Sequence, residues 1–190
     1  KLQKFKPLNK RIYRLKDLYS KKVIFSPTYP QRQSALSAIY YKKNFFQGIS
    51  ETINNLKCKY VFDIGSNIGY YSRSYSIHGE NLEIIAIEPS LRNISFLTRN
   101  IDDLSNVFVF QLGLSNKFGR FKLSIPKYGE YRKGERKKMT GLLSAMGNKD
   151  NKGTRFVSGD NLIQFLQIES SLIGWVKIDV EGFEKNVLEG

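Results

Sequence analysis

A carboxylate followed by two closely spaced glycines stands at the end of a short apolar run, in the segment YVFDIGSNIGYYS. The carboxylate is Asp63, and the glycines are Gly65 and Gly69. Glycine permits a tight turn with a positive φ angle and lets a ligand approach the backbone closely. A P-loop would need a closing Gly-Lys-Ser/Thr, and a dinucleotide fingerprint would need a third glycine; the segment has neither. An acid in such a turn repels phosphate and attracts a cationic amine.

A second carboxylate, Glu88, ends the apolar run LEIIAIEP about twenty residues after the glycine turn. At this place in a nucleotide-binding α/β sheet an acid accepts hydrogen bonds from the ribose hydroxyls, whereas an NADP-dependent enzyme prefers arginine. S-adenosylmethionine combines a ribose with an ammonium and a sulfonium group and carries no phosphate. Asp63 alone would fit a turn-forming or helix-capping acid equally well, but the pair at this spacing favours S-adenosylmethionine binding.

A third acid, Asp179, closes the apolar run WVKIDV, and Glu181 follows two residues later. Two carboxylates this close can push the pKa of one of them upward. Either residue is therefore a candidate to accept the proton of a hydroxyl group during a transfer reaction. The pair could instead hold a divalent cation that orients the hydroxyl, and the sequence does not decide between these roles. His78 stands just before Gly79 and is expected to interact with a helix dipole, away from the ligand.

Strand and helix patterns alternate along the chain and indicate how these acids are positioned. Near-continuous apolar strands in such an alternation are typical of a parallel sheet covered on both faces. Ligands of these sheets bind beyond the carboxyl ends of the strands, so Asp63, Glu88 and Asp179 should lie along one edge. We predict parallel strands at 60–64, 82–89, 106–114 and 175–180, an antiparallel strand at 119–126, a loop at 127–152, and helices at 31–46, 49–56, 70–79, 90–104, 160–168 and 184–190.

The positive charge is concentrated at the N-terminus. The net charge is +14, and residues 1–43 contribute +11 of it, from twelve Lys or Arg and the single acid Asp17. We predict a basic arm over residues 1–30, which could attract nucleic acid, anionic lipid or an acidic glycan, or simply be solvated. Residues 31–190 are expected to form one domain. The sequence has no apolar run of membrane-spanning length, and its single cysteine, Cys58, suits a reducing compartment, so we expect a cytoplasmic location.

Four segments together resemble the FkbM-type S-adenosylmethionine-dependent methyltransferases: YVFDIGSNIGYYS, IIAIEPSLRNISFLTRN, QLGLSNKFGRFKL and WVKIDVEGFEKNVLEG. The resemblance implies the Rossmann-like class I methyltransferase sheet, mostly parallel with helices on both faces. It implies methyl transfer to a hydroxyl of a saccharide or small metabolite, with Asp179 and Glu181 facing the reacting centre. The cofactor-binding residues that it implies are Asp63, Gly65, Ser66, Asn67, Gly69, Tyr70, Glu88, Pro89 and Gly113.

The sequence departs from that family at its end and leaves alternatives open. Class I methyltransferases continue after the fourth core strand with a helix, a fifth strand and a closing hairpin, so we expect a sheet truncated after its fourth strand. A divalent cation is possible as a second cofactor, although we assign no metal ligands. The basic arm keeps an RNA ribose O-methyltransferase as an alternative. A non-catalytic methyltransferase-like module is the other, against which the retained strand-end acids argue.

Overall fold

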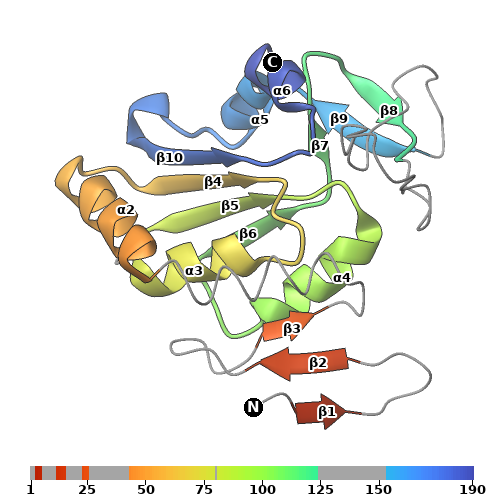
Figure 1. Ribbon diagram of the computed structural model, residues 1–190. Coiled ribbons are helices and arrows are strands. Elements are labelled where there is room, and N and C mark those ends of the chain that lie inside the picture. The colour runs from red at the N-terminus through yellow and green to blue at the C-terminus, as the bar shows by residue number, and fades with distance from the viewer. Residues whose placement is uncertain (1–2, 6–11, 16–22, 26–42, 80, 124–152) are drawn as a thin grey trace, which may run out of the picture.

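The computed structural model describes residues 3–5, 12–15, 23–25, 43–79, 81–123 and 153–190, and its centre is a parallel sheet (Figure 1). Four strands form this sheet in the order β10-β4-β5-β6. They are β4 (Tyr60–Ile64), β5 (Glu83–Ile87), β6 (Val107–Phe110) and β10 (Ile173–Ile178). All three pairings are parallel, which confirms the predicted sheet, and the carboxyl ends of the strands share one edge.

Side chains of the central strands alternate between two buried faces, which explains why both strands read as continuous apolar runs. Val61 and Ile84 belong to the cluster on one face. Phe62 and Ile85 belong to the cluster on the other face. Burial of both faces leaves little freedom to slip the register, because a shift by one residue would exchange the two sets. The register places Asp63 directly opposite Lys177 of β10.

Three helices cover the first face: α2 (Lys43–Asn55), α3 (Tyr70–His78) and α4 (Leu91–Asn100) (Figure 1). The prediction of separate helices at 31–46 and 49–56 is wrong where it can be compared, because α2 runs continuously through Gly48; residues 31–42 lie outside the described part of the chain. Phe46, Ile49 and Ile53 form one buried stripe at helical spacing. Packing of that stripe outweighs the cost of about 1 kcal/mol for a glycine inside a helix.

The second face is covered by α5 (Gly159–Phe165), α6 (Glu184–Leu188) and the short strand β7 (Gly113–Leu114). Leu162 of α5 and Val187 of α6 are buried against the same face of the sheet as Phe62. Helices therefore lie on both faces, as predicted. A 3₁₀ turn, η1 (Ser170–Leu172), leads into β10.

A small second sheet follows the carboxyl edge of the first, in the order β7-β9-β8 (Figure 1). It contains β8 (Gly119–Phe121) and β9 (Thr154–Val157), which pair antiparallel, and β7 runs parallel to β9. The predicted antiparallel strand is confirmed over residues 119–121. The predicted single strand at 106–114 is wrong: Leu112 N donates to Phe110 O (3.0 Å), a tight turn that ends β6 and sends β7 into the second sheet. The predicted loop at 127–152 lies outside the described residues.

Within the predicted basic arm, the described residues form three short antiparallel strands in the order β1-β2-β3. They are β1 (Gln3–Phe5), β2 (Ile12–Leu15) and β3 (Val23–Phe25), and β3 lies beside α4 (Figure 1). The part of the chain that the structure describes contains no helix both long and apolar enough to cross a membrane.

Candidate functional site

The loop between β4 and α3, residues 65–69, adopts a backbone that its sequence selects. Gly65, Asn67 and Gly69 all have positive φ angles, of 75°, 53° and 82°. Glycine and asparagine tolerate this left-handed region better than other residues. A Cβ atom on Gly65 would lie 2.1 Å from the carbonyl oxygen of Asp179, so only glycine fits there. The turn therefore brings the end of β10 into direct contact with the loop.

Backbone hydrogen bonds fix this loop to the end of β5. The N–H groups of Gly65 and Ser66 both donate to the carbonyl oxygen of Ile87, over 2.9 and 3.0 Å. The N–H group of Asn67 donates to Oε2 of Glu88 (2.9 Å). The Glu88 carboxylate thus holds the loop in place as well as ending its own strand.

Asp63 is buried completely, with 0% of its surface exposed. Its Oδ2 accepts a hydrogen bond from the Ser72 hydroxyl (2.6 Å), and its Oδ1 lies 3.1 Å from Nζ of Lys177. Burial of a carboxylate costs several kcal/mol, and a hydrogen bond and a counter-charge offset that cost. Ser72 and Lys177 therefore hold the Asp63 carboxylate in place near the end of β4.

Lys177 is a site residue that the sequence analysis missed. Its Nζ also lies 3.3 Å from the carbonyl oxygen of Gly65 and 3.8 Å from Oδ2 of Asp179. The signal was present in the alternation of WVKIDV, which places Lys177 and Asp179 on the same side of their strand. A lysine inside an apolar strand needs a counter-charge nearby, and the pairing of β10 with β4 provides it in Asp63.

Glu88 is 3% exposed and makes three hydrogen bonds to the protein. Besides Asn67 N, its partners are Ser90 N (2.8 Å) and the side-chain amide of Asn93 (3.2 Å), both on Oε1. Burial raises the pKa of Glu88, and the three hydrogen bonds oppose that rise, while the charge of Asp63 adds to it. A carboxylate has about four acceptor positions, so about one remains for a ribose hydroxyl.

Asp179 and Glu181 lie in the turn between β10 and α6, where the environment separates them. The Asp179 side chain is 62% exposed. Glu181 has a left-handed backbone, with φ of 55°, an uncommon conformation that concentrates at functional sites. Partial burial, then the charges of Asp179 and Glu184, raises the pKa of Glu181. Glu181 is therefore the member of the pair for which the structure indicates a strengthened hold on a proton.

Glu184 stabilises this turn from the start of α6. Its Oε1 accepts hydrogen bonds from the N–H groups of Val180 (3.2 Å) and Gly182 (3.1 Å). Bonds to backbone N–H groups, including its own, lower the pKa of Glu184. An ionised Glu184 therefore fixes the segment that carries Glu181.

The buried hydroxyl of Ser66 has no hydrogen-bond partner among the described residues. Ser66 is only 3% exposed and stands inside the positive-φ loop. A buried hydroxyl without a partner costs about 1–3 kcal/mol, which a bound ligand can recover. Ser66 therefore fits the predicted cofactor contact.

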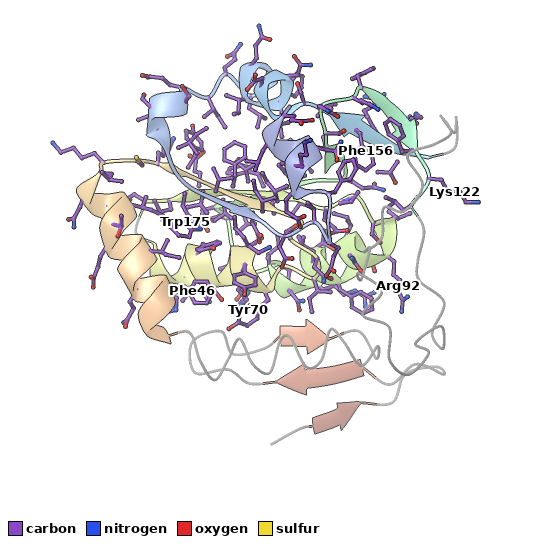
Figure 2. The ribbon with its side chains drawn as sticks, turned by 45° about the horizontal axis from the view of Figure 1, so that its top comes forward. Phe46, Tyr70, Arg92, Lys122, Phe156 and Trp175 are labelled. Carbon is purple, nitrogen blue, oxygen red and sulfur yellow. The ribbon has the colours of Figure 1, made fainter. Side chains whose placement is uncertain are left out.

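Three other predicted cofactor residues are engaged in packing. Tyr70 begins α3 with its ring 6.3 Å from that of Phe46, and the two labelled side chains lie together in Figure 2. Pro89 accepts a hydrogen bond from the Thr154 hydroxyl at its carbonyl oxygen (3.2 Å). A Cβ atom on Gly113 would lie 2.1 Å from the ring of Phe156, so packing alone accounts for that glycine.

His78 ends α3 and lies in the helical layer that packs against Phe46. Its ring stacks on the Phe46 ring at a centroid distance of 6.1 Å, and its carbonyl oxygen accepts a hydrogen bond from Ser50. His78 is the last residue of α3, at the end of the helix opposite to the loop at 65–69. Among the described residues, no group of three or more His, Cys, Asp or Glu side chains could hold a metal ion.

These groups suit a ligand that carries both a cation and a nucleoside. The buried Asp63 carboxylate suits an ammonium group, the remaining acceptor position of Glu88 suits a ribose hydroxyl, and the Ser66 hydroxyl is available to either. The glycine loop supplies close backbone approach between them. The chemistry of S-adenosylmethionine therefore fits the residues that are present.

Comparison with known proteins connects this arrangement with a family. The model of the methyltransferase FkbM domain family matches residues 63–190, well over half of the chain, beginning at Asp63. No curated protein matches the chain.

Two solved structures match parts of this chain at low sequence identity. The methyltransferase FkbM of Methylobacillus flagellatus KT has 14% sequence identity and a TM-score of 0.44, over 82% of this chain and 38% of that one. Pyrococcus horikoshii TYW2, solved in complex with MeSAdo, has 16% identity and a TM-score of 0.36, over 61% of this chain and 40% of that one. This chain therefore spans less than half the length of these structures.

Proposed function

Because this chain belongs to the family of methyltransferases with an FkbM domain, we propose that it transfers a methyl group from S-adenosylmethionine to a hydroxyl of a saccharide or small metabolite. The buried Asp63–Glu88 pair on either side of the glycine loop carries the proposal. Both carboxylates are at most 3% exposed, and both hold or border the same loop. A turn with only a structural role would not need these two carboxylates to be buried, because burial of a charged group is costly.

The residues of the carboxyl edge divide the binding of the cofactor among them. Asp63 would attract the ammonium group, and Glu88 would accept a hydrogen bond from the ribose. Ser66 would donate its buried hydroxyl, and Gly65 would let the ligand approach the backbone. Tyr70, Asn67, Gly69, Pro89 and Gly113 would shape the surrounding wall.

The proposed reaction depends mainly on alignment of the acceptor hydroxyl with the methyl group of the cofactor. When bound, S-adenosylmethionine supplies a methyl group that its sulfonium already activates. The protein then has to align a hydroxyl oxygen with that carbon and accept its proton. We assign the proton to Glu181, because its raised pKa matches the role of a base better than the exposed Asp179 does. Asp179 would orient the acceptor hydroxyl by a hydrogen bond.

The proposal also specifies the extent of the domain and the class of acceptor. We place the methyltransferase domain in residues 31–190 and treat residues 1–30 as a separate basic segment. A saccharide hydroxyl is favoured because the acids Asp179 and Glu181 suit a neutral polyol better than a polyanion. RNA would meet like charge at that turn.

The proposal is tested by calorimetric titration of S-adenosylmethionine and S-adenosylhomocysteine into the whole chain. Asp63→Asn and Glu88→Gln are titrated beside it. We expect the wild type to bind both ligands and each variant to lose at least about tenfold in affinity, since a charge-assisted hydrogen bond contributes about 1.5–3 kcal/mol.

Glu83→Gln is the matched control, because Glu83 is an acid at the opposite end of the same strand, β5. There it forms a partly exposed ion pair with Lys59 (2.8 Å). Its removal should leave ligand affinity unchanged. Folded wild-type protein that binds neither ligand would refute the proposed function, and equal losses in Glu83→Gln and Glu88→Gln would refute the assignment of the site.

A further inference from the structure

Lys177 has no role in the reaction proposed above, although it lies at the proposed site. Its side chain is 14% exposed, and its Nζ contacts Asp63 Oδ1 (3.1 Å), Gly65 O (3.3 Å) and Asp179 Oδ2 (3.8 Å). The ammonium also lies 4.9 Å from the centre of the Tyr71 ring. One cation therefore stands between two carboxylates from adjacent strands, at the place where the cofactor loop begins.

The two carboxylates differ in how strongly they hold that cation. Asp63 is fully buried, whereas the Asp179 side chain is 62% exposed. Attraction between charges is stronger where water is excluded, so the ammonium favours Asp63 while nothing else is bound there. The longer distance to Asp179 agrees with that preference.

We propose that Lys177 is a positioning residue, the internal counter-ion of Asp63, which passes from Asp63 to Asp179 when the ammonium group of the cofactor binds at Asp63. The inference rests on the proposed function. Two ammonium groups cannot share one buried carboxylate without strong repulsion. The flexible four-carbon stem of lysine and the nearby Asp179 give the displaced charge a place to go.

The exchange has a consequence for the order of events. Before the cofactor binds, Lys177 supplies the counter-charge of Asp63. After it binds, Lys177 fixes Asp179 beside the acceptor position. Cofactor binding would thereby complete the acceptor site, so we expect the cofactor to bind first.

Other titratable groups near Asp63 do not replace Lys177. Tyr75 and Tyr71 face it from α3; burial and the charge of Asp63 raise the pKa of Tyr75, which keeps that phenol neutral. Glu88 lies across the loop and adds negative charge. Without Lys177, the buried Asp63 carboxylate would therefore lack a counter-charge until the cofactor supplies one.

The test compares two ligands that differ in the amino-acid portion. S-adenosylhomocysteine carries the ammonium group, and 5′-methylthioadenosine lacks it. Both are titrated calorimetrically into wild type, Lys177→Met and Lys177→Arg. In Lys177→Met we expect the affinity for S-adenosylhomocysteine to rise about tenfold or more above that of wild type, because the ammonium group of the ligand no longer has to displace Lys177 from Asp63. Lys177→Arg should stay within about threefold of wild type, and 5′-methylthioadenosine should bind all three proteins alike.

The ligand pair separates the exchange from a general structural role. An equal loss for both ligands in Lys177→Met, or no change for either, would overturn the inference, while leaving the proposed function intact. Wild-type protein that binds neither ligand would overturn both. If Lys177→Met does not fold, Asp179→Asn gives the test at an exposed position: weaker binding of S-adenosylhomocysteine alone supports the exchange, and unchanged binding of both ligands overturns it.

Discussion

The contact between Gly65 and Asp179 predicts that Gly65→Ala is strongly destabilising. Gly65 has a φ of +75°, and an added Cβ would lie 2.1 Å from the Asp179 carbonyl oxygen and 2.9 Å from its carbonyl carbon. These are backbone atoms, so no side-chain rotation can relieve the overlap. The strand end that carries Asp179 would have to move away from the loop.

Two costs add in this variant. The left-handed backbone costs an L-residue about 1–2 kcal/mol. Overpacking of a filled interior typically costs about 1–3 kcal/mol more. We expect a loss of roughly 2–5 kcal/mol in the free energy of unfolding, which for a chain of this size corresponds to about 4–20 °C in Tm.

Urea denaturation followed by circular dichroism measures the effect, with Gly48→Ala as control. Gly48 lies inside α2, and a Cβ there would meet nothing within 4 Å. Alanine at that position should stabilise the protein by about 0.5–1 kcal/mol. A loss below about 1 kcal/mol in Gly65→Ala, with normal S-adenosylhomocysteine binding, would refute the close contact between loop and strand.

Three further changes test other parts of the site. Glu181→Gln should lower the rate at which S-adenosylhomocysteine is produced from a saccharide acceptor by about 10²–10⁴-fold. It should also remove the fall in rate at acid pH, because the raised pKa of Glu181 causes that fall. An unchanged pH profile would assign the proton to another group. Glu88→Gln should lower the free energy of unfolding more at pH 4 than at pH 7, as measured by urea titration. Burial raises the pKa of Glu88, so its carboxyl stabilises the folded state below the pKa of the unfolded chain and loses that contribution as the pH rises through its folded pKa. A loss of stability that grows with pH would contradict this sign. Arg73→Met should lower the free energy of unfolding by about 1–3 kcal/mol in thermal denaturation. It removes the buried hydrogen bond from Arg73 to Asn100 O (2.7 Å), whereas the exposed Asp103 can be solvated. An unchanged stability would mean that Arg73 does not stabilise the contact between α3 and α4.

The strands of the parallel sheet and the acids at their ends could be predicted from the sequence, because buried parallel strands have a simple sequence pattern. A buried strand reads as an apolar run, and its ligand-facing end is the residue where the run stops. Asp63 and Glu88 were found in that way, and both are buried where predicted. Ser90 precedes α4, and its hydroxyl accepts a hydrogen bond from Asn93 N, as is typical of a serine at an N-cap.

The remaining elements depended on contacts that no local pattern shows. β9 is four residues long, follows a polar stretch and is placed by pairing with β7 and β8. The turn at Leu112 splits one run between two sheets; Gln111 and Gly113 interrupt the run, but they do not show which sheet the residues after them join. Gly48 looked like a helix boundary, but the buried stripe of α2 overrides it.

Lys177 was missed for a different reason. The sequence analysis considered acids at strand ends and assigned no role to a lysine within a strand. The parallel register of β10 and β4 brings Lys177 opposite Asp63, and only the pairing of two strands far apart in the sequence reveals this. A lysine in an otherwise apolar strand is therefore worth matching against the acids of every neighbouring strand.

The two halves of the proposed chemistry meet at one backbone contact. The cofactor loop contains Gly65, and the segment with the acceptor acids begins at Asp179, whose N–H donates to Ile64 O (3.0 Å) and whose carbonyl lies against Gly65. Positive φ angles occur on both sides of this contact, in the loop at 65–69 and at Glu181 and Gly182. Neither segment can relax without displacing the other, because both are held by backbone hydrogen bonds to strands. A change of loop position on cofactor binding must therefore be transmitted to Asp179 by the backbone as well as by the charge of Lys177.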